Sequence, residues 1–143
     1  MTIHLQKLCV GCDSVEDLAA WIAERMAEKR RRGEPQEQVH RTRMMPKQVA
    51  ELLDGGSLFW IVKGTIQVRQ ALLDLRAVKG EDGIGRCELV LEPRLVRVEP
   101  QPRRPFQGWR YLRDADAPRD LRSHAGGDLP PTLVTELRAL GLW

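Results

Sequence analysis

The most constraining feature of the sequence is a pair of apolar segments that meet at Gly64. Residues 58–63 are almost uninterruptedly apolar, which predicts a strand buried on both faces. Residues 65–78 also have strand character, but their apolar positions change phase partway along. One alternation contains Ile66 and Val68, and the other contains Leu73, Leu75 and Ala77. A phase change inside a long strand predicts a bulge or bend, which we place at residues 69–71, like those at the corners of small barrels.

Three helices are predicted from local signals. The first begins at Ser14, because Ser14 and Asp17 have the spacing of a capping box and the apolar residues that follow recur every three or four positions. Pro46 suits the first turn of a second helix, and Gly55 suits its left-handed stop. Residues 132–140 predict a closing helix with one apolar face.

Shorter strands complete the expected fold. They are predicted at residues 3–10, 39–43, 86–91, 95–98 and 109–112, and residues 113–128 are predicted to be a poorly ordered loop. This order favours a single α+β domain over residues 1–143. We expect a curled, mostly antiparallel sheet or a small barrel of about five to seven strands, with three helices.

Composition excludes several classes of protein. The chain has 143 residues, of which 42% are hydrophobic, and this is a globular rather than a disordered balance. Its longest uncharged apolar run is far shorter than the roughly 20 residues that a membrane helix needs, and its start has no secretory apolar core. Three cysteines do not suit a secreted disulfide framework, so we expect a cytoplasmic location.

The cysteines and histidines do not predict a metal or a cofactor. Cys9 and Cys12 have C-x-x-C spacing, but a structural zinc site needs four ligands and the chain contains one such pair. We interpret these cysteines as small buried side chains without metal. The glycines of residues 80–85 suit a hairpin turn rather than a phosphate-binding loop. No catalytic residue is assigned.

The basic excess of the protein lies in residues 94–122. This segment contains eight arginines against four acids, a net charge of +4, whereas the whole chain has a net charge of +3. It also contains Phe106, Trp109 and Tyr111, and arginine interleaved with aromatic rings is typical of single-stranded nucleic-acid sites. A second basic segment, residues 40–47, precedes a predicted helix. The candidate nucleic-acid-binding residues are Arg43, Lys47, Arg103, Arg104, Trp109, Arg110 and Tyr111.

Purely structural interpretations of the same residues stay open. The charges of residues 40–47 are equally those of a solvated edge strand. Trp109 and Tyr111 would share one face of a strand, with Arg110 on the other, so the two rings line either a groove or the core.

Four blocks of the sequence support a family resemblance: KLCVG, HRTRMMPK, ELLDGGSLFWIVKG and RRPFQGWRYL. Together they resemble a family of short alphaproteobacterial proteins that is known only as a domain of unknown function. The resemblance implies a bacterial single-domain protein and brings no activity with it. In architecture, a helix ending at Gly55 and Gly56, then a buried strand and a long bent strand, is similar to the PUA-like barrels, including the ASCH and EVE domains.

We consider three functions. The first, which the PUA-like similarity implies, is a non-catalytic module that binds RNA or a modified base, with no membrane partner. The second, which the ASCH similarity implies, is a small amidohydrolase acting on a modified nucleoside, for which Thr42, Lys47 and Glu88 are the residues to consider. The third is a protein–protein interaction domain without a small ligand, which would dock through its exposed loops.

Overall fold

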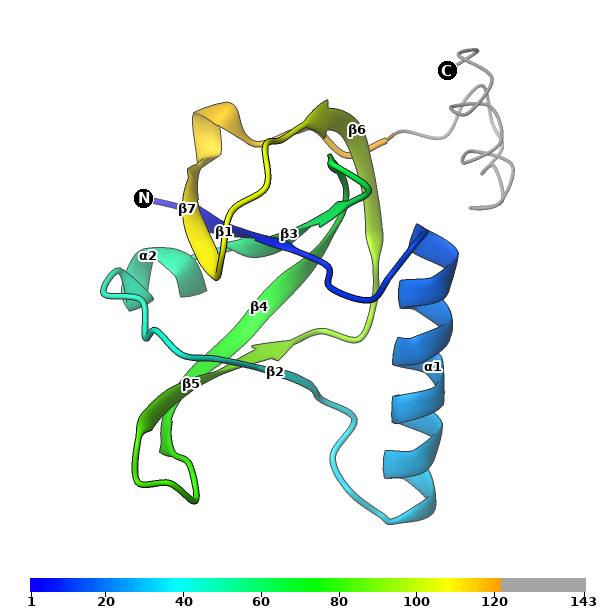
Figure 1. The fold of residues 1–143 in the computed structure, drawn as a ribbon, viewed down its shortest axis with the longest axis vertical. Helices are drawn as coiled ribbons and strands as arrows, with labels where there is room; N and C mark the ends of the chain where they lie inside the picture. The colour runs from blue at the N-terminus through cyan, green and yellow to red at the C-terminus, as the bar shows by residue number, and fades with distance from the viewer. Residues whose placement is uncertain (122–143) are drawn as a thin grey trace.

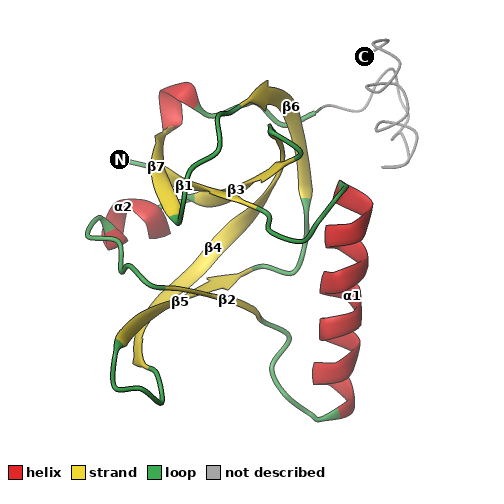
Figure 2. Ribbon diagram, in the orientation of Figure 1, coloured by secondary structure: helices red, strands yellow, loops and turns green. Residues whose placement is uncertain are grey.

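The computed structural model describes residues 1–121, which form a curled seven-stranded sheet flanked by two α-helices (Figures 1 and 2). The strands are β1 (Ile3–Leu8), β2 (Gln38–Thr42), β3 (Ser57–Val62), β4 (Thr65–Lys79), β5 (Gly85–Leu91), β6 (Val96–Pro102) and β7 (Trp109–Arg113). Their order is β2-β5-β4-β3-β1-β7, and β6 pairs with β4. The helices are α1 (Val15–Arg31) and α2 (Val49–Leu53), and a 3-10 turn, η1 (Asp114–Asp116), follows β7.

The sheet is mixed and open. β1 pairs with β3 in parallel, and the other five strand pairings among residues 1–121 are antiparallel. The mostly antiparallel α+β fold is therefore confirmed, but β2 and β7 end the path without pairing with each other, so a closed barrel was the wrong alternative. Among residues 1–121, none of the helices combines the length and the apolar character that crossing a membrane requires.

β3 is the central buried strand. All six of its residues are buried, as the apolar run predicts, because it lies between β1 and β4 and both of its faces are covered. Gly56, just before it, has no room for a side chain: a Cβ there would overlap the carbonyl oxygens of Leu52 and Ile3. Gly55 has a φ of +81°, which suits a glycine stop between α2 and β3.

The bend in β4 lies later than the sequence predicts. Ile66, Val68, Gln70 and Leu72 all belong to one buried alternation, and the phase changes only at Leu73, which is exposed. The register with β5 is irregular between Leu72 and Asp74, where β4 exchanges β3 for β5 as its partner. The predicted position of the bend, residues 69–71, was therefore wrong by about two residues. The position of the bend is set by the change of strand partner from β3 to β5, which no local sequence pattern records.

The helices differ in how closely they follow local signals. α1 begins as predicted, with the Ser14 hydroxyl accepting a hydrogen bond from the Asp17 amide, and it buries Val15, Leu18, Ile22 and Met26. α2 begins three residues after Pro46, because side chains from β7 hold the preceding residues in another conformation. The predicted helix at residues 132–140 lies outside the described residues.

The segment after β5 is more ordered than predicted. β6 continues through Pro100 and Pro102, and Pro100 falls where the register with β4 shifts between Ile66 and Val68. Residues 113–121 are not a loose loop, because η1 is followed by a β-bridge between Val98 and Asp120. Arg69 also forms a two-pronged ion pair with Asp120, with both N–O distances at 2.7 Å.

Two apolar clusters lie on opposite faces of the β3–β1–β7 part of the sheet. The larger cluster contains Leu5, Trp60 and the buried face of α1, with Trp109 and Tyr111 packed against it. The smaller contains Phe59 and Leu112, with Leu8 and Phe106 packed against it. Side chains that alternate along β1 and β7 therefore face different surroundings, which decides where each candidate site residue lies.

Candidate functional site

Trp109 and Tyr111 fasten the loop before α2 to the edge of the sheet. The Trp109 indole Nε1 donates a hydrogen bond of 2.8 Å to the Met44 carbonyl oxygen. The Tyr111 hydroxyl accepts hydrogen bonds from the backbone amides of Lys47 and Gln48, at 2.9 and 3.2 Å. Both rings are half-buried against the larger cluster and contact each other edge to face, with centroids 4.9 Å apart. Both rings therefore lie at the edge of the core, and their polar atoms hydrogen-bond to backbone groups of the loop before α2.

This fastening brings two of the predicted cations to the two predicted aromatic residues. Arg43 and Lys47 are both exposed, and the side chain of neither has a hydrogen bond or an ion pair with another residue in the described part of the chain. We call Arg43, Lys47, Trp109 and Tyr111 the basic corner. Sequence distance conceals this grouping, because the loop and β7 are more than 60 residues apart.

Two of the other predicted arginines, Arg103 and Arg110, lie on the opposite face of β7. Arg103 donates hydrogen bonds to Gln6 and Gln101, whose side chains are on the side of the smaller cluster. The Arg110 guanidinium lies 4.4 Å from the centre of the Phe106 ring. Arg104 is exposed. Six of the seven predicted residues therefore divide into two sets on either side of one edge strand.

Ion pairs neutralise part of the basic excess. Arg97 pairs with Glu16 of α1 at 3.0 Å, and Arg113 pairs with Asp116 at 2.9 Å. The Asp116 carboxylate accepts a hydrogen bond from Arg113, which lowers the pKa of that carboxyl. The free positive charge of residues 94–121 is consequently smaller than the count of arginines implies.

The cysteines are free thiols, and two of them are close together. Burial raises the pKa of the Cys9 thiol, and a hydrogen bond with Cys12 adds to this effect. In residues 1–121, no three histidine, cysteine or acidic side chains are arranged to hold a metal ion. A thiol with a raised pKa is a poor nucleophile, so Cys9 does not suit covalent chemistry.

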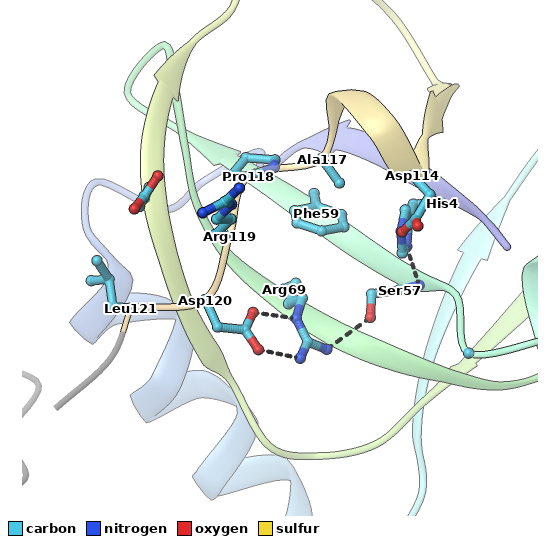
Figure 3. A pocket seen from close by; sticks show the side chains of 12 residues that line it. His4, Ser57, Phe59, Arg69, Asp114, Ala117, Pro118, Arg119, Asp120 and Leu121 are labelled. Carbon is cyan, nitrogen blue, oxygen red and sulfur yellow. Dashed lines mark hydrogen bonds and ion pairs between the residues drawn. The ribbon is translucent and has the colours of Figure 1, made fainter.

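A groove of about 1060 Å³ contains residues that superficially form a catalytic triad (Figure 3). His4 Nε2 lies 2.7 Å from an Asp114 carboxylate oxygen, and His4 Nδ1 lies 3.0 Å from the backbone nitrogen of Ser57. That N–H can only donate, so Nδ1 accepts from it and cannot take a proton from a hydroxyl. The proton on Nε2 then points at Asp114.

The serine of this group is not placed for attack. Ser57 is 1% exposed, and its Oγ accepts a hydrogen bond of 3.0 Å from Arg69, which Asp120 holds in turn (Figure 3). The Asp120 carboxylate raises the pKa of Arg69, and the guanidinium lowers the pKa of Asp120. The polar groups of this network are hydrogen-bonded to one another. They fix the start of β3 and do not activate a nucleophile.

The residues considered for an amidohydrolase do not converge either. Thr42 lies opposite Cys87 in the β2–β5 pair, and its hydroxyl donates to the Met44 carbonyl. Glu88 lies opposite Arg41 and is paired with it at 3.0 Å, so it is on the other face of the same strands.

Comparison with known proteins gives a family and no activity. No curated protein matches the chain, and no solved structure matches it, so the similarity to PUA-like barrels is not confirmed. One family model matches residues 5–143, and its description is "Protein of unknown function (DUF1489)". Since the match covers nearly the whole chain, and the resemblance of its four sequence blocks is to such a family, the chain belongs to this family.

Proposed function

We propose that this domain is a non-catalytic module that binds single-stranded RNA, or a modified base within it, at the basic corner. One observation carries the proposal: Arg43 and Lys47 are exposed cations without partners in the described residues, on a loop that three hydrogen bonds hold beside Trp109 and Tyr111. A loop that is already ordered loses little conformational entropy when it binds a phosphate.

The chemistry of the corner suits a phosphate chain. Phosphate contacts from lysine and arginine release counterions, which favours binding at low salt. Arginine in addition offers a planar fork that matches two phosphate oxygens. Arg103 and Arg110, on the far side of β7, would lie next to an RNA strand that continues round this edge. These contacts are electrostatic, so the module needs no closed pocket at the corner.

The test is the salt dependence of binding to a fluorescently labelled single-stranded RNA, measured by anisotropy. Replacing Arg43 and Lys47 by Gln should weaken binding and reduce the slope of log K against log salt by about 0.7 for each lost contact. The control removes the same two charges at exposed positions elsewhere, Arg31→Gln with Lys79→Gln, and should leave the slope unchanged. Melting curves of both double variants show whether the fold is intact.

A further double variant, Arg103→Gln with Arg104→Gln, tests the opposite face of β7. A reduced slope in this variant places the RNA on both faces of the edge strand. If the wild-type protein does not bind single-stranded RNA even at low salt, the proposal is wrong.

A second candidate function is protein docking at the same loop. Met44 is 67% exposed and Met45 is 36% exposed, and flexible methionine side chains are common on protein-binding surfaces. In that case the Arg43 and Lys47 variants would leave RNA binding unaltered, while a Met44→Ser variant would lose the partner.

A further inference from the structure

A separate cavity of about 410 Å³ lies where the end of β1 and the start of α1 meet β2 and β3. We call it the Lys7–His40 pocket, after the two polar side chains that distinguish it. Its walls include the rings of Trp21 and Trp60, and Val10 at its rim is 87% exposed, so the pocket is open to solvent. Its volume is within the range of roughly 300–1,000 Å³ that is usual for small-ligand sites.

Lys7 supplies an ammonium group without an ion-pair partner among residues 1–121. Its strand register places it beside Trp60 of β3 on one side and Trp109 of β7 on the other. Burial lowers the pKa of Lys7, and the side chain has no hydrogen bond or ion pair with another residue in the described part of the chain. Asp17 also lines the pocket, and its carboxylate accepts a hydrogen bond from the Asp13 amide but forms no ion pair with Lys7. A half-buried cation of this kind favours a ligand with a carbonyl or anionic oxygen.

His40 supplies a buried nitrogen without a partner. Its Nε2 is fully buried and, among residues 1–121, has no hydrogen-bond partner, while the ring packs edge to face on Trp60 with centroids 5.2 Å apart. Burial lowers the pKa of His40 to about 4, and the charges of Lys7 and Arg25 add to this effect, so the ring is neutral at pH 7. A neutral imidazole offers one donor and one acceptor.

We propose that the Lys7–His40 pocket binds the ring of a base that carries a lactam edge, as uracil and guanine do, either in a free nucleotide or as an unstacked base of bound RNA. Lys7 donates to the ring carbonyl. His40 turns its ring so that the now buried Nε2 faces the cavity and pairs with the adjacent ring N–H. The indole of Trp21, 38% exposed at the mouth, covers the ring face, and the Arg25 guanidinium lies 4.2 Å above that indole. Aromatic stacking of this type is usual in base recognition.

The RNA form of this inference rests on the proposed function, because the pocket adjoins the basic corner. His40 lies in β2, and Arg43 comes directly after the end of that strand, three residues further along the chain. Trp109, which fastens the corner, lies opposite Lys7 in the β1–β7 pair. A base in the pocket would therefore leave its phosphates next to Arg43.

The experiment follows the indole N–H signals of the ¹⁵N-labelled full chain during titration with uridine monophosphate. We expect the Trp21 and Trp60 signals to shift, with weaker binding of cytidine monophosphate and no such shifts with ribose 5-phosphate. Lys7→Gln should weaken the binding of uridine monophosphate about tenfold, as expected for loss of a charge-assisted hydrogen bond. His40→Phe keeps the ring packing on Trp60 and should weaken it as well. Lys79→Gln removes a charge from an exposed position on β4 and should have no effect.

Reductive methylation provides a readout that needs no variant. Uridine monophosphate should slow methylation of Lys7, detected by mass spectrometry, and should leave Lys79 unaffected. Equal methylation of Lys7 with and without the nucleotide would overturn the proposal, as would equal shifts with ribose 5-phosphate.

A parallel titration with a uridine octamer separates this proposal from the proposed function. If the octamer binds and depends on Arg43 and Lys47 but not on Lys7 or His40, the pocket proposal is wrong and the RNA proposal stands. If uridine monophosphate binds and depends on Lys7 while the octamer does not bind, the pocket takes a free nucleotide and the RNA proposal fails. Loss of both interactions in Lys7→Gln, in a variant that melts normally, supports the pocket as the base site of an RNA-binding module.

Discussion

Gln70 is the centre of a buried polar chain that positions one wall of the Lys7–His40 pocket. It is 0% exposed, and its side-chain oxygen accepts a hydrogen bond of 2.7 Å from the Trp60 indole. Its amide donates to the Gln38 side chain at 2.6 Å and to the Glu92 carbonyl at 2.9 Å. Gln70→Met keeps the approximate volume of the side chain and removes all three hydrogen bonds. The change therefore tests the cost of leaving buried polar groups without hydrogen bonds, and not the cost of altered packing.

The expected loss of stability follows from the groups left behind. The Trp60 N–H and the Gln38 carboxamide would both be buried without a partner, since Gln38 Nε2 already has none among the described residues. Each unsatisfied buried group costs about 1–3 kcal/mol, so Gln70→Met should lower the free energy of unfolding by about 2–6 kcal/mol. That is a large part of the roughly 5–15 kcal/mol that stabilises a typical domain.

Urea unfolding followed by circular dichroism measures this loss. The matched control is Gln67→Met on the same strand, where the side chain is only half-buried and makes one hydrogen bond, to the Val62 carbonyl, so its cost should be below about 1 kcal/mol. Trp60→Phe, made in the wild type and in Gln70→Met, closes a double-mutant cycle. Because phenylalanine leaves no N–H to satisfy, the two changes should be non-additive by about 1–3 kcal/mol. A Gln70→Met loss no larger than that of Gln67→Met, together with an additive cycle, would refute the reasoning.

Three further predictions concern Trp60, the half-buried Cys9 and Cys12, and His40. Trp60→Ala should destabilise the protein by about 3–5 kcal/mol, because the ring is 3% exposed, and a near-normal melting temperature would show that the ring is not needed in the core. A chelator should leave the melting temperature unchanged, and stoichiometric zinc in the purified protein would contradict our interpretation of Cys9 and Cys12. The pKa of His40 is lowered to about 4 from 6.5, so the unfolded chain binds its proton first as the pH falls. Stability should therefore decrease between about pH 6.5 and pH 4, and this decrease should be smaller in His40→Phe, as measured by urea unfolding at several pH values.

The sequence by itself determined the elements whose signals are local. α1 follows from the Ser14–Asp17 cap and an apolar stripe, both of which lie within the helix that they define. The buried strand β3 follows from its unbroken apolar run, and the turn between β4 and β5 from its glycines. Local signals of this type act over a few residues and do not depend on the rest of the fold.

The candidate site was only partly accessible from the sequence. Arg43, Lys47, Trp109 and Tyr111 could be named individually from charge and aromatic content. Lys7, by contrast, carries no signal of its own in a strand of mixed polarity, and sequence reasoning missed it as a site residue. His40 stood out as one member of a basic segment and as a conceivable metal ligand, but not as part of a pocket.

Tertiary structure decided how these residues meet. The parallel pairing of β1 with β3 and the antiparallel pairing with β7 place Lys7 between Trp60 and Trp109, which are separated from it by 53 and 102 positions in the chain. The same strand contacts put Arg103 and Arg110 on the opposite face from Trp109, delay the start of α2, and move the bend of β4 to the point where its partner changes. Strand partner and register depend on which apolar faces bury each other across the whole domain. A side chain's surroundings at a sheet edge are therefore fixed by residues far away in the sequence, and no local pattern contains them.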